Sequence, residues 1–539
     1  MAVAPFRELE RSYFDLRWHL DPVAASQAGV TAYDDRYGRY GPDTLEPHLA
    51  ALKSLAVALE EASTDQLEDE IDRTALLNEM RVSVRRFERE RPQVRDPGFW
   101  LSHLLGGLHV LLLRHDRPPD GRARAIAARL EDVPRFLDDA RATLQEPVAV
   151  FVETALRMTV GGALLIKQAG AELAARHPDQ AEQLRAAADG AAAALIAFQH
   201  DLERWLESGS EHFAIGEDLF NFHLHYEHAL RDTAPELWRY GHHLMEELEA
   251  DLGRRAARFE AGGHWSEVVQ RLRADHPPGD TLVEVYAREM ERARDFVRQR
   301  DLVAIPDAPL RVAATPEFMR PLVPFAAYDS PGAYSSDRTG WFWVTLPDPA
   351  LPPIQQERML RDHCRYELGA TALHEGYPGH HLQLVTMQQQ ASHTRKNLWT
   401  PLTVEGWALY CEDMMAEEGF YASEEERLFQ RLHLLWRAVR VLLDVGLHTR
   451  GMTFEQAVDY MVAHLHVERA NAEAEVRRYC ATPTYQLCYA VGRRELLRLR
   501  DDFRAARGSA ASLRAFHDAV LPNGGLPVSF IRWGLGLGE

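Results

Sequence analysis

The chain has 539 residues, of which 46% are hydrophobic and 26% charged, and its formal net charge is −20. These values are ordinary for a soluble globular protein with a large buried core and, by length, two or more domains. The acidity argues against nucleic-acid phosphates as the main partner. The four cysteines include no Cys-x-x-Cys pair, which argues against a disulfide framework or a zinc site built from cysteine.

The N-terminal sequence, residues 1–10, lacks the basic region followed by an apolar core that is typical of a signal peptide. No window of 18 uninterrupted apolar residues occurs, so no membrane-spanning helix is expected. We therefore predict a cytoplasmic protein without a membrane partner.

Residues 1–302 are predicted to form a scaffold of long packed helices. Strong helix formers (Ala, Leu, Glu and Arg) dominate the stretches near residues 46–63, 66–92, 122–145, 148–168 and 178–208. Residues 303–353 form a proline-rich segment with short strands, and residues 354–539 a second helical subdomain. The predicted fold is mainly α with a small antiparallel β element, and the three segments are expected to make one integrated catalytic fold.

Three histidines and one glutamate cluster within residues 220–228, which makes this segment a rival to the histidine-rich segment 371–383 as a candidate site. His223, Tyr226 and Glu227 fall on one face of a helix, but no open three-ligand set is apparent. We favour a packed helix that lines the substrate channel over a second metal site.

The composition changes over residues 303–353, where closely spaced prolines interrupt any long helix. Residues 310–314 and 341–345 are the best strand candidates in the chain. We interpret residues 340–345 as an edge strand that holds an extended peptide by main-chain pairing, as in β-strand addition. A small structural hairpin that caps the helices is the alternative.

The segment 371–383 places three histidines and one carboxylate within eight residues, between apolar flanks. Neutral imidazole is the commonest zinc ligand, and a glutamate directly after the first histidine suits a general base. His374 is therefore a predicted metal ligand and Glu375 the predicted base.

The second histidine ligand requires a break in the usual spacing. In the common His-Glu-x-x-His motif it lies at i+4 on the same helix face, but this chain has Pro378 there. A local bulge that absorbs about two extra residues would bring His380 to that place, and such bulges occur at functional sites. We favour His380 as the second ligand, with His381 as the close rival.

A third ligand is predicted on a helix over residues 402–413, which Thr403 is expected to cap. Glu405 lies in its first turn. Two histidines and one glutamate leave the fourth zinc position open, which is the mark of a catalytic site. The alternative is that Glu405 merely favours a helix N-terminus.

Tyr485 and Tyr489 lie four residues apart near the start of another predicted helix, and hence on one face. A tyrosine hydroxyl near the metal can stabilise a developing oxyanion, although paired tyrosines also pack in cores and grooves. Arg478 and Arg493 are candidate anchors for a substrate carboxylate, because guanidinium binds this group bidentately.

The segments HEGYPGHHLQ and TVEGWALYCED resemble those of a bacterial family, domain of unknown function 885. The resemblance covers nearly the whole chain, with weaker matches at Asp21-Pro22 and residues 33–36. The family is thought to be related to the helical gluzincin metallopeptidases, which include carboxypeptidases and oligopeptidases. This implies a large helical zincin-like fold with a deep cleft. It also aligns Gly379-His380 with the Gly-His of the relatives' motif and favours a site position for Tyr489.

The leading hypothesis is a zinc-dependent hydrolase that cleaves short peptides or peptide-like amides, with Mn²⁺ or Co²⁺ as other metals that suit the same ligands. Glu375 would pass a proton from water to the leaving amine. His381 and Tyr489 would stabilise the oxyanion. One alternative is the same site acting on a small secondary metabolite, and another is a non-catalytic helical binding protein with a vestigial metal site. The oligomeric state is not predicted.

Overall fold

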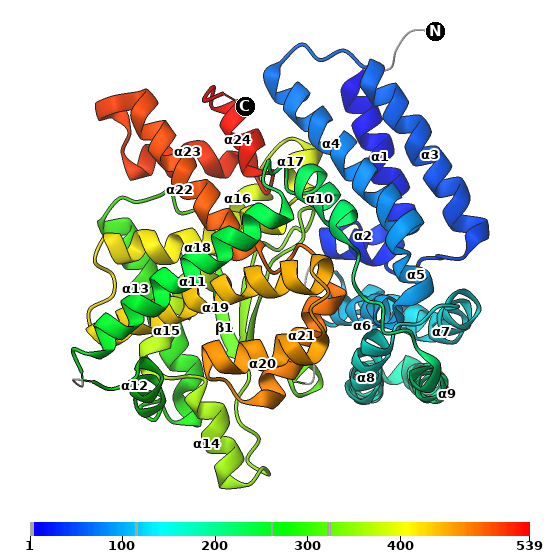
Figure 1. The fold of residues 1–539 in the computed structure, drawn as a ribbon. Coiled ribbons are helices and arrows are strands. Elements are labelled where there is room, and N and C mark those ends of the chain that lie inside the picture. Colours follow the sequence, from blue (N-terminus) through cyan, green and yellow to red (C-terminus); the bar gives the residue numbers. More distant parts are fainter. Residues whose placement is uncertain (1–4, 114–116, 260–261, 321–322, 324, 539) are drawn as a thin grey trace. The chain divides into compact units, whose positions relative to one another are not determined.

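The computed structural model describes residues 5–113, 117–259, 262–320, 323 and 325–538. The chain divides into two compact units, which are treated separately below (Figure 1). Unit 1 comprises residues 1–213, 316–322 and 331–338, and unit 2 comprises residues 214–315, 323–330 and 339–539. Helices dominate both units, so the prediction of a mainly α fold is confirmed. The three predicted segments do not coincide with the two units, because residues 214–302 belong to unit 2.

Unit 1 is helical throughout its main segment. Its helices are α1 (Phe6–Leu20), α2 (Pro22–Ala28), α3 (Pro42–Glu61), α4 (Leu67–Arg85), α5 (Pro92–Arg95), α6 (Pro97–Leu113), α7 (Pro119–Thr143), α8 (Ala149–Arg176) and α9 (Ala181–Ser208). Leu104, Ile126, Phe136 and Leu165 are fully buried in its core. By length and composition alone, α8 is apolar enough to cross a membrane, but it packs along α9 and against α6 as core helices also do.

Unit 2 contains the remaining helices and the strands. They are α10 (Glu217–Tyr226), α11 (Ala234–Ala256), α12 (Trp265–Leu272), α13 (Leu282–Gln299), β1 (Leu310–Ala314), β2 (Ala326–Asp329), β3 (Gly340–Val344), α14 (Pro353–Arg361), α15 (Arg365–Glu375), α16 (His380–Met387), α17 (His393–Asn397), α18 (Pro401–Glu417), α19 (Glu424–Thr449), α20 (Phe454–Leu465), α21 (Arg469–Ala481), α22 (Cys488–Arg507), α23 (Leu513–Val520) and α24 (Val528–Gly534). Figure 1 labels most of them. All predicted metal ligands lie in this unit.

The sheet of unit 2 is mixed, which corrects the expectation of an antiparallel element. Its strand order is β1-β3-β2, with β1 parallel and β2 antiparallel to β3. Both predicted strands form, at β1 and β3. However, β3 lies in the centre with its backbone hydrogen bonds used on both sides, so the interpretation of residues 340–345 as a peptide-binding edge strand is wrong.

The sheet positions the helix that carries the first predicted ligand. Side chains alternate along β3, and Phe342 and Val344 point to one face, where both are fully buried. They pack there in one hydrophobic cluster with Tyr286 of α13 and with Leu368 and Ala372 of α15. One face of the sheet therefore supports α15 directly beneath His374 and Glu375.

Candidate metal centre

The His-Glu segment forms two helices separated by a turn, and not one helix with a bulge as the sequence suggested. Helix α15 ends at Glu375, and α16 begins at His380. The four residues between them, 376–379, include a cis peptide bond between Tyr377 and Pro378. The physical reason is that the Gly-Tyr-Pro-Gly sequence supplies two flexible residues and one without an N–H donor, so the helix ends and starts again.

Glycine is required at the end of this turn. A Cβ atom on Gly379 would lie 1.9 Å from the carbonyl oxygen of His374, far inside van der Waals contact. The turn is also tied to α18, because the indole Nε1 of Trp407 donates a hydrogen bond of 2.9 Å to the carbonyl of Pro378. Trp407 is only 1% exposed. The close approach of Gly379 brings the first residue of α16 back towards the last turn of α15.

Three side chains converge at this point as a potential ligand set. One donor atom from each of His374, His380 and Glu405 can be chosen so that all three lie within 4.8 Å of one another. The Nε2 atoms of both histidines face the same carboxylate oxygen, Oε2 of Glu405, at 3.9 Å for His374 and 3.3 Å for His380. All three residues are nine-tenths or more buried. Among the described residues this is the one cluster of metal-binding side chains found.

Two of the three predicted ligands, His374 and Glu405, have protein partners that orient them. Nδ1 of His374 lies 2.8 Å from Oε1 of Glu412, and Glu412 is 1% exposed. The hydroxyls of Tyr485 and Tyr489 donate to Oε1 of Glu405 at 2.7 and 3.1 Å. These contacts direct Nε2 of His374 and Oε2 of Glu405 towards the centre of the cluster, as partners of metal ligands commonly do.

The cluster has a surplus of negative charge. Burial alone would raise the pKa of Glu405, but the hydrogen bond and charge of His380, the charge of His374 and the Tyr485 hydroxyl together lower it to about 2. Burial alone would lower the pKa of His380, but Glu405, Glu375 and Glu412 raise it. Three carboxylates thus surround two imidazoles, an arrangement that attracts a cation.

Helix α18 carries both Glu405 and Glu412, two turns apart on one face. It starts earlier than predicted, at Pro401, with Thr400 as its N-cap residue. Thr403, the predicted cap, lies inside the helix and donates to the carbonyl of Leu526 at 2.7 Å. Proline at the first position and threonine before it explain this start. Glu405 therefore sits within a fully buried helical turn and not at an exposed N-terminus.

Two glycines allow α22, which carries Tyr489, and the turn before it, which carries Tyr485, to approach Glu405. A Cβ on Gly406 of α18 would lie 2.6 Å from backbone atoms of Gly492, and a Cβ on Gly492 of α22 would lie 1.9 Å from the carbonyl oxygen of Leu402. The two backbones therefore touch at this crossing. Tyr489 is one turn before Gly492, so the close approach places its hydroxyl on Glu405.

We expect Gly492→Ala to separate the two helices and to lower the free energy of unfolding by about 1–3 kcal/mol or more, since overpacking a tight contact forces the backbone apart. The same shift would loosen the hydrogen bonds from Tyr485 and Tyr489 to Glu405. Thermal unfolding measures the loss. The matched control is Gly253→Ala in α11, where the added methyl group meets nothing within 4 Å and should leave stability unchanged or raise it by roughly 0.5–1 kcal/mol. Equal stability of the two variants would contradict this account of the crossing.

His381, the predicted rival ligand, points away from the cluster. Its Nδ1 lies 3.0 Å from the hydroxyl of Tyr328 in β2, and its Nε2 lies 3.2 Å from the carbonyl oxygen of Ala308. Burial lowers the pKa of His381 to about 4, so the ring is neutral, accepts from Tyr328 and donates to Ala308. Gly340 lies against the pair, because a Cβ there would be 2.5 Å from Nδ1 of His381. His381 therefore links α16 to the sheet.

Glu375, the predicted base, is the last residue of α15 and is half-buried. It makes no side-chain hydrogen bond or ion pair with any described residue. Glu375 directly follows the predicted ligand His374 in the chain, and its negative charge is among those that raise the pKa of His380. A carboxylate that is close to the cluster and not held by a partner is available for proton transfer.

In the rival cluster at residues 220–228, His223 and His228 are engaged with polar groups of the protein. His223 pairs with Glu227 at 2.7 Å. His228 is 1% exposed, and its two ring nitrogens lie 2.7 Å and 3.1 Å from the hydroxyls of Thr400 and Thr484. Through Thr400 it supports the start of α18. No three-ligand set forms here among the residues described, and the substrate channel stays a prediction.

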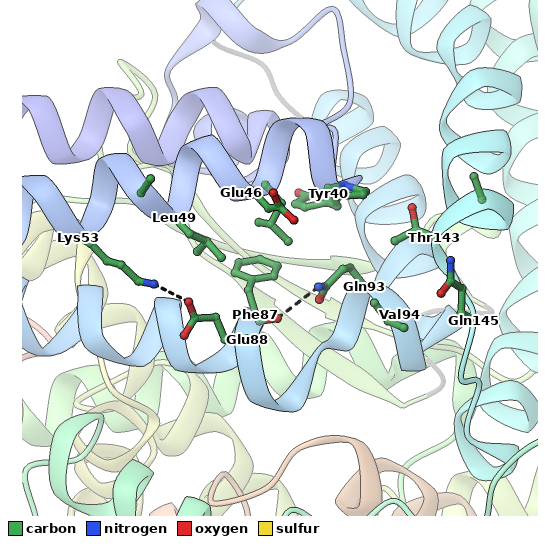
Figure 2. Close-up of a pocket in the computed structure, with 14 residues that line it drawn as sticks. Tyr40, Glu46, Leu49, Lys53, Phe87, Glu88, Gln93, Val94, Thr143 and Gln145 are labelled. Carbon is green, nitrogen blue, oxygen red and sulfur yellow. Dashed lines mark hydrogen bonds and ion pairs between the residues drawn. The ribbon is translucent and has the colours of Figure 1, made fainter.

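A pocket of about 560 Å³ lies wholly within unit 1 and contains none of the predicted site residues (Figure 2). Leu49 and Phe87 form part of its wall, and the Gln93 amide donates to the carbonyl of Phe87 at 3.3 Å. The charged groups drawn at one end, Lys53 and Glu88, pair with each other at 2.6 Å. The pocket thus has the size of a ligand site but no cluster of reactive groups.

Comparison with known proteins identifies relatives along the whole chain. The model of the family DUF885, described as bacterial protein of unknown function, matches residues 22–534. The structure of "a putative lipoprotein of unknown function from Shewanella oneidensis" is similar with a TM-score of 0.81 and 22% identity, over 99% of this chain and 100% of that one. "The putative lipoprotein from Colwellia psychrerythraea" gives 0.84 and 18%, over 99% of both chains. No curated protein matches the sequence.

These comparisons correct the predicted location. Both solved structures are described as lipoproteins, albeit provisionally, and lipoproteins are anchored to membranes. The assignment to the cytoplasm, made from the N-terminal sequence, is therefore wrong. At 18–22% identity the two structures otherwise show the fold alone.

Proposed function

This chain belongs to the DUF885 family of bacterial proteins, and from the geometry of its site we propose that it is a zinc-dependent hydrolase of short peptides or peptide-like amides. The observation that carries the proposal is the convergence of His374, His380 and Glu405, with Glu375 next to His374 in the chain. Two imidazoles and one carboxylate form a ligand set of catalytic zinc sites, which keep one position open.

The donor chemistry of the cluster fits zinc. The Nε2 atoms of His374 and His380 face one carboxylate oxygen, and the opposite atoms of His374 and Glu405 are held by Glu412, Tyr485 and Tyr489. Nδ1 of His380 is buried and has no hydrogen-bond partner among the described residues, so Nε2 is the nitrogen that faces a partner. Zinc bound here would supply a Lewis acid that polarises a carbonyl and acidifies water, and Mn²⁺ or Co²⁺ suits the same ligands.

The protein side of the reaction is proton transfer by Glu375. Its carboxylate takes a proton from the attacking water and delivers it to the nitrogen of the leaving amine, so that one group serves as base and then as acid. Two histidines, one glutamate and a second glutamate next to the first histidine form the pattern of gluzincin metallopeptidases. The segments HEGYPGHHLQ and TVEGWALYCED, from which we expected a relationship to that class, support the proposal.

The hydroxyls of Tyr485 and Tyr489 both donate to Glu405, which favours an orienting role. We expect Tyr485→Phe to weaken zinc binding by about 10–100-fold, the usual effect of removing a partner of a metal ligand. Competition with a chelator of known affinity measures this change. The control is Tyr421→Phe, because the buried Tyr421 hydroxyl has no hydrogen-bond partner among the described residues. Equal zinc affinity in both variants would contradict the role of Tyr485. The oxyanion role expected for Tyr489 stays a prediction, whereas the two ring nitrogens of His381 are already used by Tyr328 and Ala308, so the structure does not favour that role for His381.

The substrate is tested with zinc-replete protein and a panel of short unblocked peptides, with products identified by mass spectrometry. Cleavage at one consistent position supports the proposal. Bound zinc without cleavage of any peptide would favour the second candidate, the same metal site acting on a small non-peptide metabolite.

A further inference from the structure

Arg437, on α19, is a half-buried cation whose guanidinium forms no hydrogen bond or ion pair with a carboxylate among the described residues. Its Nη1 donates to the carbonyl of His433, one turn back on the same helix, at 3.2 Å. Its Nε is buried and has no hydrogen-bond partner, and no described side chain bonds to Nη2. The charge of Glu412 acts on Arg437 from beyond ion-pair distance, but burying guanidinium N–H groups without hydrogen-bond partners is unfavourable, so the presence of Arg437 here points to a function.

The neighbouring arginines differ from Arg437 because each is already paired. Arg440 and Arg478 both bind Glu475, at 3.0 and 2.8 Å. Arg493 forms an ion pair with the buried carboxylate of Asp413. Arg478 and Arg493, the two anchors expected from the sequence, are therefore held by acids of the protein. Of these four arginines, Arg437 is the one with no carboxylate within ion-pair distance among the described residues.

Arg437 lies beside the candidate metal centre. Its Cζ is 5.8 Å from the centroid of the Tyr489 ring, and the hydroxyl of that tyrosine donates to Glu405. Burial alone would raise the pKa of Glu412, but the bond and charge of His374, followed by the charge of Arg437, lower it. The side chain of Tyr489 thus lies between Arg437 and Glu405, which is a predicted metal ligand.

We propose that Arg437 binds a carboxylate of the substrate, and that the substrates are short peptides with a free C-terminal carboxylate, cleaved close to that end. The inference rests on the hydrolase proposed above. Guanidinium forms charge-assisted hydrogen bonds with a carboxylate, and an extended residue spans roughly 3.3–3.6 Å. When the C-terminal carboxylate of a peptide binds Arg437, one of the last amide bonds of that peptide therefore lies near the ligand set.

Binding to the Glu375→Gln variant tests the proposal without any need for turnover. Calorimetry with the zinc-loaded variant compares N-acetyl-trialanine with its C-terminal amide. The free acid is expected to bind about 10–100-fold more tightly, as for hydrogen bonds to charged groups. Adding Arg437→Met should remove this preference and leave the affinity for the amide unchanged. Arg427→Met, on the same helix but with its side chain 44% exposed, should retain the preference.

The possible outcomes separate this inference from the proposed function. The carboxylate site would be overturned if the acid and the amide bound equally or if neither bound. It would also be overturned if Arg437→Met weakened the binding of both equally, because Arg437 would then only position Glu412. Cleavage of free and amidated peptides with equal kcat/KM would also overturn it while leaving the hydrolase intact. Selective binding of the acid without cleavage would support Arg437 and reject hydrolysis.

Discussion

His380→Ala is expected to abolish stoichiometric zinc binding, whereas His381→Ala is expected to retain it. The two residues are neighbours, but only His380 directs a ring nitrogen at Glu405, at 3.3 Å. The ring of His381 uses both nitrogens on Tyr328 and Ala308. Removing one of three ligands should lower zinc affinity by more than the roughly 10–100-fold typical of losing a ligand's hydrogen-bonding partner.

Metal content per folded chain, measured by mass spectrometry after gel filtration, distinguishes the two variants. His381→Ala is the matched control, since it makes the same truncation one residue away. Its own effect should appear as lower thermal stability, because the link between α16 and the sheet is lost. Zinc retained by His380→Ala and lost by His381→Ala would reverse the ligand assignment. No zinc in the wild type, even when zinc is supplied, would favour a binding protein with a vestigial site.

Glu375→Gln is expected to lower kcat by roughly 10²–10⁴-fold, the contribution typical of a general acid–base group, while zinc content stays at the wild-type value. Glutamine keeps the size of the side chain and its hydrogen-bonding capacity but does not accept a proton at neutral pH. Because Glu375 is not a ligand of the proposed centre, the metal should remain.

Glu375→Asp provides the companion measurement. The shorter side chain keeps the charge but withdraws the carboxylate by one methylene group, so its rate should fall between those of the wild type and Glu375→Gln. Both variants are compared at saturating substrate and equal zinc content. A Glu375→Gln enzyme with the wild-type rate would remove Glu375 from the proton-transfer step.

The candidate ligands could be chosen from sequence because few residue types bind zinc and the chain concentrates them. His374 and His380 lie six residues apart in a segment with two glycines and a proline, and the structure brings them together with Glu405. The sequence did not predict the form of the turn that brings these residues together, because it suggested one helix with a bulge. Helical periodicity indicates helix on both sides of the glycines, but it contains no information on where one helix ends or on how tightly Gly379 approaches the carbonyl of His374.

The residues that support the ligands were harder to find for different reasons. Glu412 follows Glu405 by seven residues, or two helical turns, so its position on the ligand face was readable from the sequence. Tyr328 and Arg437 offered no such signal. Their roles depend on contacts with His381 and Tyr489, which are distant along the chain and adjacent only in the folded protein.

The sheet illustrates the same limit. The strands at β1 and β3 were predicted from their aromatic and β-branched content, but β2, with only four residues, was missed. Without β2 the strand order was unknown, and β3 was placed at an edge. Strand order depends on pairing between separated segments, and short local patterns do not encode it.

The central claim is tested most directly by following peptide cleavage while the metal is removed and returned. The wild-type protein is assayed on one short free peptide as prepared, after dialysis against a chelator, and after addition of one equivalent of zinc. The account predicts activity in the first state, loss of activity in the second and recovery in the third. Cleavage that persists in the metal-free protein, or no cleavage by protein shown to contain zinc, would contradict it.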